Sequence, residues 1–457
     1  MNNEFSGLVL QVRQENRTVD KMLEAEGSVN DWISRQIEVL THNSGIKPFL
    51  PKEDLIRAAE DYVSERLGSD EAQKAGEALS IGALHTADHL GGFYSTQSFQ
   101  GDLFFSRLLL EAQEDVPCFP ILAGGCVPLG SSTYARGIIA YGKTKEAQKL
   151  PIYPRKESAF MASFAPGFER DMITKARVQT LARIENKAIR RNTKYLFDDV
   201  YLRDDILSKE RFSDQAVLLG KGIMDRVSEL YGGKSFLFLE IEEVFRRLIL
   251  KELENSESLL YSLLGDGVFM QCLKDSVDTE GHHLSELLFK SSGKERAIPT
   301  DPESIKEKLL GGEILPGFYL SWLAAGLLRG FSFFGGVFQS CYLPSWHELT
   351  LSAMKSCGYN EVADAAKDYD FSGYISGPLV MLFDTGDGAT GAGPLEVMAV
   401  KPDEERFGKL LDTDIRSAHE MGMFEFYNDL IKAEDKADAW YECIARYLRT
   451  QYPDNML

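Results

Sequence analysis

Short apolar runs closed by turn residues are the feature that most limits how this chain can fold. Residues 117–122 read Pro-Cys-Phe-Pro-Ile-Leu and lead directly into a glycine pair, and residues 137–141 form a second such run. Runs of this length bounded by turn residues are typical of buried strands. Residues 394–400 have the same character. The sequence therefore predicts a small mixed sheet with buried strands around 117–141 and 378–400.

Most of the remaining chain carries apolar residues at helical spacing. Pro51 and the acids after it mark the start of one helix, and Gly68 marks its end. The pattern predicts helices within residues 1–80 and over residues 168–194, 236–253, 259–273, 404–421 and 424–447. The many cations of 168–194 are expected to pair with acids of the same chain. Helix blocks combined with isolated strands predict a helix-rich α+β or α/β fold.

The chain has 457 residues, which exceeds what a single hydrophobic core usually serves. Glycine and serine become dense after residue 80, and residues 290–304 have the composition of a linker. We therefore expect four regions. They are an N-terminal helical region at 1–80, an active-site core with glycine-rich loops at 81–200, a helical region at 201–295, and a C-terminal α/β region at 296–457 that packs on the core.

Charge and cysteine usage limit the partners and the compartment. The chain carries 70 acidic and 50 basic residues, for a net charge of −20. A field of that sign repels nucleic acid and anionic membrane surfaces, so we predict neither as a partner, whereas local donors can still bind a small anionic metabolite. Six dispersed cysteines without a CxxC pair, and an N-terminus without a signal-like apolar run, predict a cytoplasmic protein. The sequence leaves the oligomeric state open.

Residues 314–343 form the most apolar stretch of the chain. Arg329 and several glycines interrupt it, and the charge-free part is shorter than the ~20 residues that a membrane span needs. We therefore predict a buried helix followed by a glycine-rich turn.

The stretch His85-Thr86-Ala87-Asp88-His89 is the first candidate site. Two histidines four residues apart share one face if the segment is helical, and both can then reach one divalent metal ion such as zinc. Asp88 is placed to act as a base, to orient a histidine, or to be a third ligand. Over five residues the stretch resembles the inverted zinc-protease motif H-x-x-E-H, with Asp88 replacing glutamate. Because aspartate is shorter, no protease activity is inferred. We predict His85, Asp88 and His89 as catalytic residues, and His85 and His89 as metal ligands; the alternative is that they are buried structural side chains.

A glycine- and hydroxyl-rich loop after the first predicted strand is the second candidate site. Glycine N–H groups, hydroxyls and a planar guanidinium suit a carboxylate or phosphate. The residues predicted to bind substrate are Gly125, Ser131, Ser132, Thr133 and Arg136, together with Gln100 from the polar stretch 94–102, which is expected to form a loop or pocket wall. The alternative is a structural turn whose Arg136 pairs with a surface acid. Cys126 is a further candidate, as a nucleophile, although most buried cysteines are inert.

Residues 384–393 contain a literal G-x-G-x-x-G. A dinucleotide site needs a helix after this motif, whereas 394–400 is predicted to be a strand, and the two aspartates would repel a pyrophosphate. The segment is therefore expected to be a hairpin loop, and we predict no nucleotide cofactor.

Two functions from different classes fit these residues. The first is an enzyme that acts on a small carboxylated or phosphorylated metabolite by hydrolase- or lyase-type acid–base chemistry, assisted by a divalent metal. The second is a non-catalytic metabolite-binding or assembly protein that uses the loop from Gly130 to Arg136 as an anion site. The second function needs the Arg136 loop but not the histidine pair. We also expect His85, Asp88, His89 and Arg136 to face one pocket.

Overall fold

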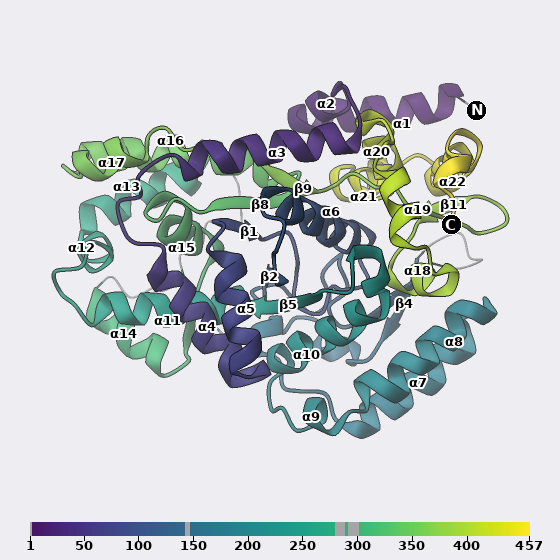
Figure 1. Ribbon diagram of the computed structural model, residues 1–457, viewed down its shortest axis with the longest axis horizontal. Helices are drawn as coiled ribbons and strands as arrows, with labels where there is room; N and C mark the ends of the chain where they lie inside the picture. The colour runs from purple at the N-terminus through teal and green to yellow at the C-terminus, as the bar shows by residue number, and fades with distance from the viewer. Residues whose placement is uncertain (1, 142–146, 279–287, 291–300) are drawn as a thin grey trace.

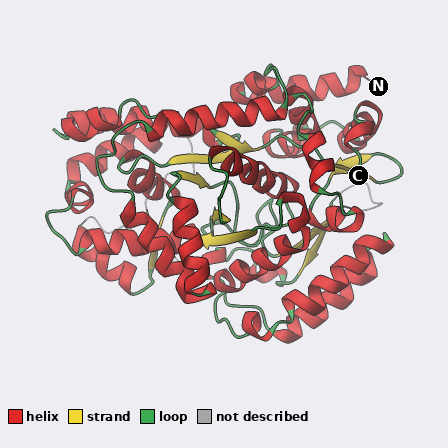
Figure 2. Ribbon diagram, in the orientation of Figure 1, coloured by secondary structure: helices red, strands yellow, loops and turns green. Residues whose placement is uncertain are grey.

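A parallel sheet of five strands forms the centre of the molecule, and helices surround it (Figures 1 and 2). The computed structural model describes residues 2–141, 147–278, 288–290 and 301–457. The strand order is β5-β2-β1-β8-β9, with every neighbouring pair parallel. The strands are β1 (Ala83–His85), β2 (Cys118–Ala123), β5 (Ser235–Glu240), β8 (Ser332–Gly336) and β9 (Tyr374–Ser376). They come from three of the four predicted regions. The helix-rich mixed fold class predicted from the sequence is confirmed.

Three antiparallel strand pairs lie outside this sheet. They are β3 (Gly137–Ala140) with β4 (Gln148–Pro151), β6 (Leu288–Lys290) with β7 (Ile314–Pro316), and β10 (Leu382–Asp384) with β11 (Ala389–Gly391). The strands predicted within 117–141 are thus present as β2 and β3. A hairpin is present at the predicted position, because Asp384 pairs with Ala389 across a turn. Its second strand, β11, lies inside the segment 384–393 that was expected to be loop.

The first 80 residues are helical, as predicted. Their helices are α1 (Asn2–Glu15), α2 (Arg17–Met22), α3 (Val29–Ser44), α4 (Glu53–Leu67) and α5 (Ser69–Leu79). Ser28 caps α3 through a reciprocal pair of hydrogen bonds with Asp31, which satisfies N–H groups that would otherwise lack partners. Gly68 ends α4 at a φ of 95°, a conformation that L side chains rarely adopt.

The middle of the chain contains eight helices among the described residues. They are α6 (Thr96–Ala112), α7 (Arg170–Arg183), α8 (Lys187–Leu196), α9 (Asp204–Leu207), α10 (Phe212–Met224), α11 (Ile241–Leu253), α12 (Leu259–Gly265) and α13 (Gly267–Asp278). Two predictions were wrong here. Residues 94–102 were expected to form a loop, but most of them begin α6. Residues 236–240, expected to be helical, form β5 instead, because each residue from Ser235 to Glu240 pairs with one of β2.

The C-terminal helices are α14 (Pro302–Leu310), α15 (Phe318–Trp322), α16 (Gln339–Ser356), α17 (Asn360–Ala366), α18 (Pro394–Val400), α19 (Glu404–Leu410), α20 (Ile415–Met421), α21 (Met423–Leu430) and α22 (Trp440–Gln451). The strand predicted at 394–400 was wrong, since this segment is α18. Pro394 occupies the first turn, and the Glu396 carboxylate accepts a hydrogen bond from the Gly393 N–H, so local capping outweighs β propensity. Of the predicted linker at 290–304, residues 291–300 lie outside the described part.

The apolar stretch 314–343 is buried in the fold, as predicted. The residues after the helix, which were expected to form a glycine-rich turn, include strand β8 instead. Arg329 is fully buried, where its guanidinium pairs with Glu252 and donates a hydrogen bond of 2.8 Å to the Ala324 carbonyl. In the part of the chain that the structure describes, no helix has both the length and the apolar character that crossing a bilayer requires.

The basic segment 168–194 forms the helix pair α7 and α8 at one side of the molecule (Figure 1). Arg170 pairs with Asp204 at 2.7 Å, and Arg177 pairs with Asp198 at 2.6 Å. Lys194 shares Asp198 at 2.8 Å. Intramolecular pairing is thus confirmed for these three cations.

Candidate functional site

The carboxyl ends of the parallel strands bring the candidate residues to one edge of the sheet. Strand β1 lies in the middle, with β2 and β5 on one side and β8 and β9 on the other. His85 is the last residue of β1, Gly124 follows β2, and Glu240 ends β5. In open α/β sheets, ligands bind outside the carboxyl ends of the strands where the strand order reverses. Here that position lies at β1.

Three ionisable side chains form a buried cluster at this edge. His85 comes from β1, Asp88 from the loop after it, and Asp102 from α6. One potential ligand atom from each residue lies within 4.8 Å of the other two. The side chains are 0%, 1% and 2% exposed, respectively, so the cluster is closed to bulk water. The chain therefore folds two carboxylates and an imidazole into one enclosed space.

Four polar atoms of this cluster lack hydrogen-bond partners among the described residues. Both ring nitrogens of His85, Oδ1 of Asp88 and Oδ1 of Asp102 are buried and unpartnered among the described residues. Leaving several such atoms unsatisfied costs about 1–3 kcal/mol each. Imidazole nitrogen and carboxylate oxygen are ligands that transition metals and zinc accept, so a divalent cation would satisfy the cluster. His85, Asp88 and Asp102 are thus the described residues best placed to hold a metal ion.

Burial sets the protonation of the cluster in the absence of a cation. Desolvation raises the pKa of Asp88 to about 7, against a hydrogen bond from Ser98 that lowers it. Desolvation and then the charge of Asp88 raise the pKa of Asp102 well above its usual range. Desolvation lowers the pKa of His85 to about 3, so the imidazole is neutral and able to act as a ligand. A cation would therefore displace protons from the two carboxyl groups.

His89 faces a different part of the edge. Residues 85–89 are not helical: His85 ends a strand, and His89 forms an isolated bridge with Gly124. The shared helical face that was the reason for pairing the two histidines therefore does not exist. The Nδ1 atom of His89 lies 3.2 Å from the Thr133 hydroxyl, and desolvation lowers the pKa of the ring to about 4. The structure thus groups His85 with the two aspartates, and His89 with Thr133.

The predicted anion loop already holds an internal carboxylate. The Gly125 N–H donates to both carboxylate oxygens of Glu242, at 2.9 and 2.8 Å, and the Cys126 N–H donates to one of them at 2.7 Å. The Ser131 and Thr133 hydroxyls lie 2.9 Å apart, and Ser132 is exposed. The backbone donors near Gly125 are thus used by the fold, whereas the Thr133 hydroxyl lies close to His89.

The side chain of Gln100 makes its hydrogen bonds to the backbone of residues 380–392 and not to the His85 cluster. Its amide nitrogen donates to the Met381 and Ala392 carbonyls, and its amide oxygen accepts from the Val380 and Met381 N–H groups. All four bonds join α6 to the β10–β11 hairpin. The structure therefore gives Gln100 a bridging position in the core.

Sequence reasoning missed Asp102, Glu240 and Glu242. Asp102 was noticed only as the end of a polar stretch, and its place beside His85 follows from the position of α6 next to β1. Glu240 directly follows a run of five apolar or small residues, 235–239, and Glu242 lies two positions further on. Such a run is the signal for the carboxyl end of a strand. Because a helix was predicted over 236–253, this strand end was not recognised.

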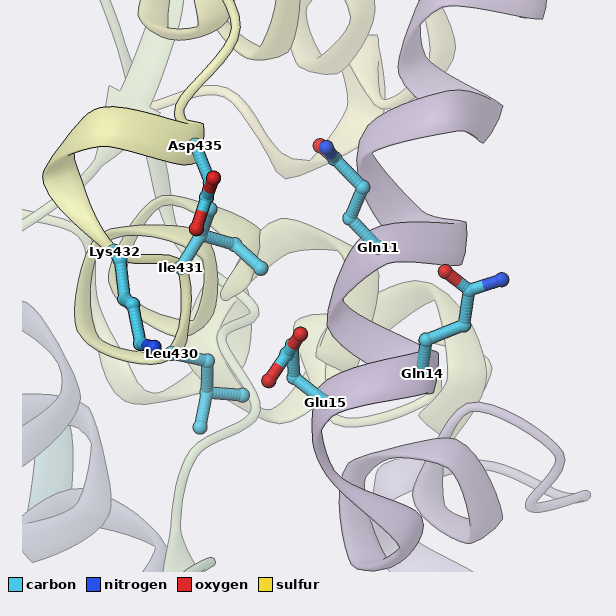
Figure 3. A pocket seen from close by; sticks show the side chains of 7 residues that line it. All are labelled: Gln11, Gln14, Glu15, Leu430, Ile431, Lys432 and Asp435. Atoms are coloured by element: carbon cyan, nitrogen blue, oxygen red, sulfur yellow. The ribbon is translucent and has the colours of Figure 1, made fainter.

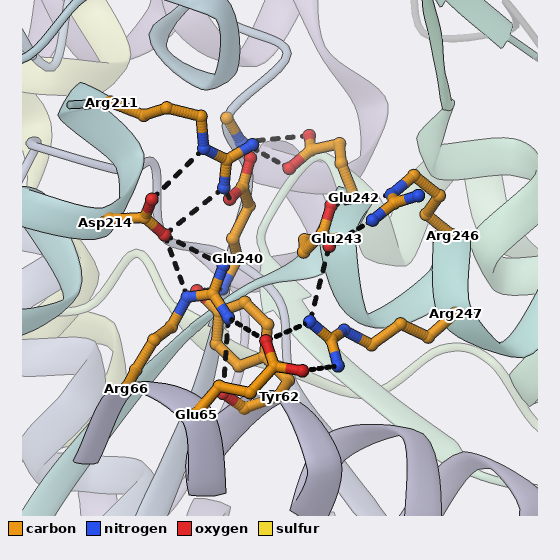
Figure 4. A network of polar contacts seen from close by, with 11 residues as sticks. Tyr62, Glu65, Arg66, Arg211, Asp214, Glu240, Glu242, Glu243, Arg246 and Arg247 are labelled. Atoms are coloured by element: carbon orange, nitrogen blue, oxygen red, sulfur yellow. Dashed lines mark hydrogen bonds and ion pairs between the residues drawn. The ribbon is translucent and has the colours of Figure 1, made fainter. Parts of the chain in front are cut away.

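An extended charge network supports the β5 end of the edge (Figure 4). The Arg211 guanidinium lies 3.0 Å from the buried Glu240 carboxylate and 3.2 Å from Asp214. Arg66 lies 2.8 Å from the same Asp214. Desolvation raises the pKa of Glu242 to about 7, with Glu240 adding to the effect. The edge therefore holds a second group of buried acids, beside the histidine-containing cluster.

A polar cavity lies elsewhere in the molecule, between α1 and residues 430–435 (Figure 3). Its volume is about 420 Å³. It is lined by Gln11, Gln14, Glu15, Leu430, Ile431, Lys432 and Asp435. None of the candidate site residues contributes to it, so we assign it no part in the chemistry at the sheet edge.

The fold and the site together define an α/β protein with buried ionisable groups at the carboxyl edge of a parallel sheet. No model of a known protein family matches the chain, and a search of curated proteins found no match. The functional argument therefore rests on the chemistry of these residues.

Proposed function

We propose that this protein is a metal-dependent enzyme that acts on a small anionic metabolite by hydrolase- or lyase-type chemistry. The observation that carries the proposal is the cluster of His85, Asp88 and Asp102, in which four buried polar atoms lack partners among the described residues. Its position at the carboxyl end of the central strand is where α/β folds bind ligands. The same ligand set suits zinc or manganese better than magnesium, which prefers oxygen and water.

Bound there, a divalent cation supplies Lewis acidity and lowers the pKa of water or of a substrate oxygen. His85, Asp88 and Asp102 hold it, and α6 fixes the position of Asp102. His89 is neutral at pH 7 because burial lowers its pKa, so it is able to accept a proton. Its Nδ1 contacts Thr133, which leaves Nε2 as the nitrogen available to substrate.

The substrate anion is held by side chains of the loop from Gly130 to Arg136. The N–H groups of Gly125 and Cys126 already bind Glu242, so hydroxyls and the guanidinium are the donors that remain. We expect Ser131, Thr133 and Arg136 to contact the substrate. Neither nucleic acid nor a nucleotide cofactor is part of the proposal. The dispersed cysteines favour a cytoplasmic setting.

A second candidate is a non-catalytic metabolite-binding or assembly protein with a structural ion. The near-complete burial of all three ligand residues favours it, because structural metal sites are closed whereas catalytic sites keep an open position.

A substrate screen with metal depletion separates the two functions. The purified protein is incubated with small phosphorylated and carboxylated esters and hydroxy acids, before and after chelation and after return of Zn²⁺ or Mn²⁺. An enzyme shows turnover that chelation removes and the ion restores. A protein that binds the ion, is stabilised by it and turns over none of these compounds supports the second candidate and contradicts the first.

A further inference from the structure

Tyr134 has an unusual backbone conformation. Its φ is 56°, in the left-handed region, and its side chain is only 5% exposed. Left-handed conformations of bulky residues cost on the order of 1 kcal/mol or more and tend to occur where a fold holds a functional group in place. The residue lies inside the predicted anion loop, directly after Thr133, so its strain fixes the path of that loop.

Two cations lie close to the Tyr134 ring, and a third lies on the neighbouring helix α7. The Arg136 guanidinium carbon lies 5.4 Å from the ring centroid, and its Nη2 lies 3.4 Å from the hydroxyl. Lys149, on β4, places its Nζ 5.7 Å from the same centroid. Arg183 lies on α7, which packs against β4. Burial raises the pKa of the Tyr134 phenol, and Arg136 and Arg183 both lower it. The loop, a strand and a helix thus each contribute one positive charge.

Within the described part of the chain, ion pairs neutralise some cations of this region, such as Arg170 and Arg177, but not these three. Among the described residues, Arg136, Lys149 and Arg183 pair with no acid, although the chain carries a net charge of −20. The Nε of Arg136 is buried and has no hydrogen-bond partner in the same part of the chain. Burial raises the pKa of the Asp429 carboxyl, and Lys149 is one of the groups that act in the opposite direction, so Lys149 has an acid in its surroundings. Unpaired cations held together repel one another, and a bound anion would relieve this cost.

We propose that Arg136, Lys149 and Arg183 form a binding site for the phosphate group of a phosphorylated metabolite, with the Tyr134 hydroxyl among its donors. A phosphate monoester carries nearly two charges at neutral pH and has three acceptor oxygens, which suits three cations better than a carboxylate does. This inference rests on the proposed function, because it names the anion of the same substrate.

The loop links this phosphate site to the sheet edge. Thr133, next to Tyr134, contacts Nδ1 of His89 at 3.2 Å, and His89 forms a bridge with Gly124 at the end of β2. A metabolite held by its phosphate at Arg136 therefore extends toward His89. The site has its own residues, none of which belongs to the His85 cluster, so the two are separable by mutation.

Titration with inorganic phosphate, followed by calorimetry at fixed ionic strength, tests the assignment. We expect saturable binding, weakened about tenfold by Arg136→Gln and by Arg183→Gln and less by Lys149→Gln, with acetate binding much more weakly. Lys175→Gln is the matched control, since Lys175 is an exposed cation on the same helix as Arg183, and it should leave the affinity unchanged.

The measurement is repeated on chelated protein to separate this site from the metal centre. Retention of phosphate binding after chelation, together with its loss in Arg136→Gln, supports the inference. Binding that chelation removes and Arg136→Gln leaves intact places the anion on the metal, which overturns this phosphate site and leaves the proposed function standing. Absence of phosphate binding, or an equal loss in Lys175→Gln, also overturns it.

Discussion

The Nε2 atom of His85 lies 3.6 Å from Oδ1 of Asp102, although one residue ends a strand and the other lies in the following helix. Neither atom has a hydrogen-bond partner within the described residues. The separation is too long for a hydrogen bond, and two ligand atoms of one cation are commonly about this far apart. This relationship is the basis of the functional account.

Gly125 is needed for packing at the sheet edge. A Cβ atom there would lie 2.0 Å from the Ser163 Oγ and 2.9 Å from a Leu90 methyl carbon. We therefore expect Gly125→Ala to lower the free energy of unfolding by about 1–3 kcal/mol, measured by urea denaturation. Gly124→Ala is the control, because its Cβ would meet no atom closer than 3.7 Å. Equal stability of the two variants would contradict this account.

Arg329 neutralises two acids in the interior. It is fully buried, pairs with Glu252, and lies 3.9 Å from Asp54. Removing it leaves a partly buried carboxylate without its cation, so Arg329→Ala should cost about 3–5 kcal/mol. Arg57→Ala removes an exposed partner of the same Asp54 and should cost less than about 1 kcal/mol. Thermal unfolding of both variants measures the difference, and similar losses would show that burial of the pair does not matter.

Glu396 should make stability depend on pH. Burial raises its pKa from 4.5 to about 8, against hydrogen bonds from the Tyr141 and Gly393 N–H groups that lower it. Because the folded-state pKa is the higher one, the folded state binds the proton more tightly. The resulting stabilisation is complete below about pH 4.5 and is lost as the pH rises toward 8.

Glu396→Gln removes this titration. The free energy of unfolding of the wild type minus that of the variant should therefore fall by roughly 1 kcal/mol per pH unit between pH 5 and 8. A destabilisation by the amide that is independent of pH shifts this difference but does not change its slope. Denaturation at a series of pH values measures it. A difference that stays constant, or that grows with pH, would refute the assignment.

The sequence predicted the fold class and most elements, because those depend on local signals. Apolar runs closed by glycine gave β2 and β3 their positions, and Pro51 and Gly68 marked the two ends of α4. The prediction went wrong where a local pattern suits two structures. Residues 394–400 are rich in apolar side chains yet form a capped helix, and 235–240 form a strand only because β2 lies beside them.

The candidate site was predicted in part. His85 and Asp88 were identified from the histidine spacing of residues 85–89, although the helical face that this spacing suggested does not exist. Asp102 was missed because its place beside His85 depends on how α6 packs against β1, which periodicity does not show. Gln100 was expected to bind substrate, yet its four backbone hydrogen bonds arise from the distant β10–β11 hairpin.

Metal content is the most direct test of the central claim. Elemental analysis is applied to the wild type, Asp102→Asn and His89→Ala, each purified without chelator and then titrated with Zn²⁺ and Mn²⁺, with circular dichroism confirming that each is folded. The account predicts one divalent ion per wild-type chain, its loss in Asp102→Asn and its retention in His89→Ala. A folded wild type that neither carries nor binds an ion, or an Asp102→Asn variant that binds it as tightly, would contradict the account.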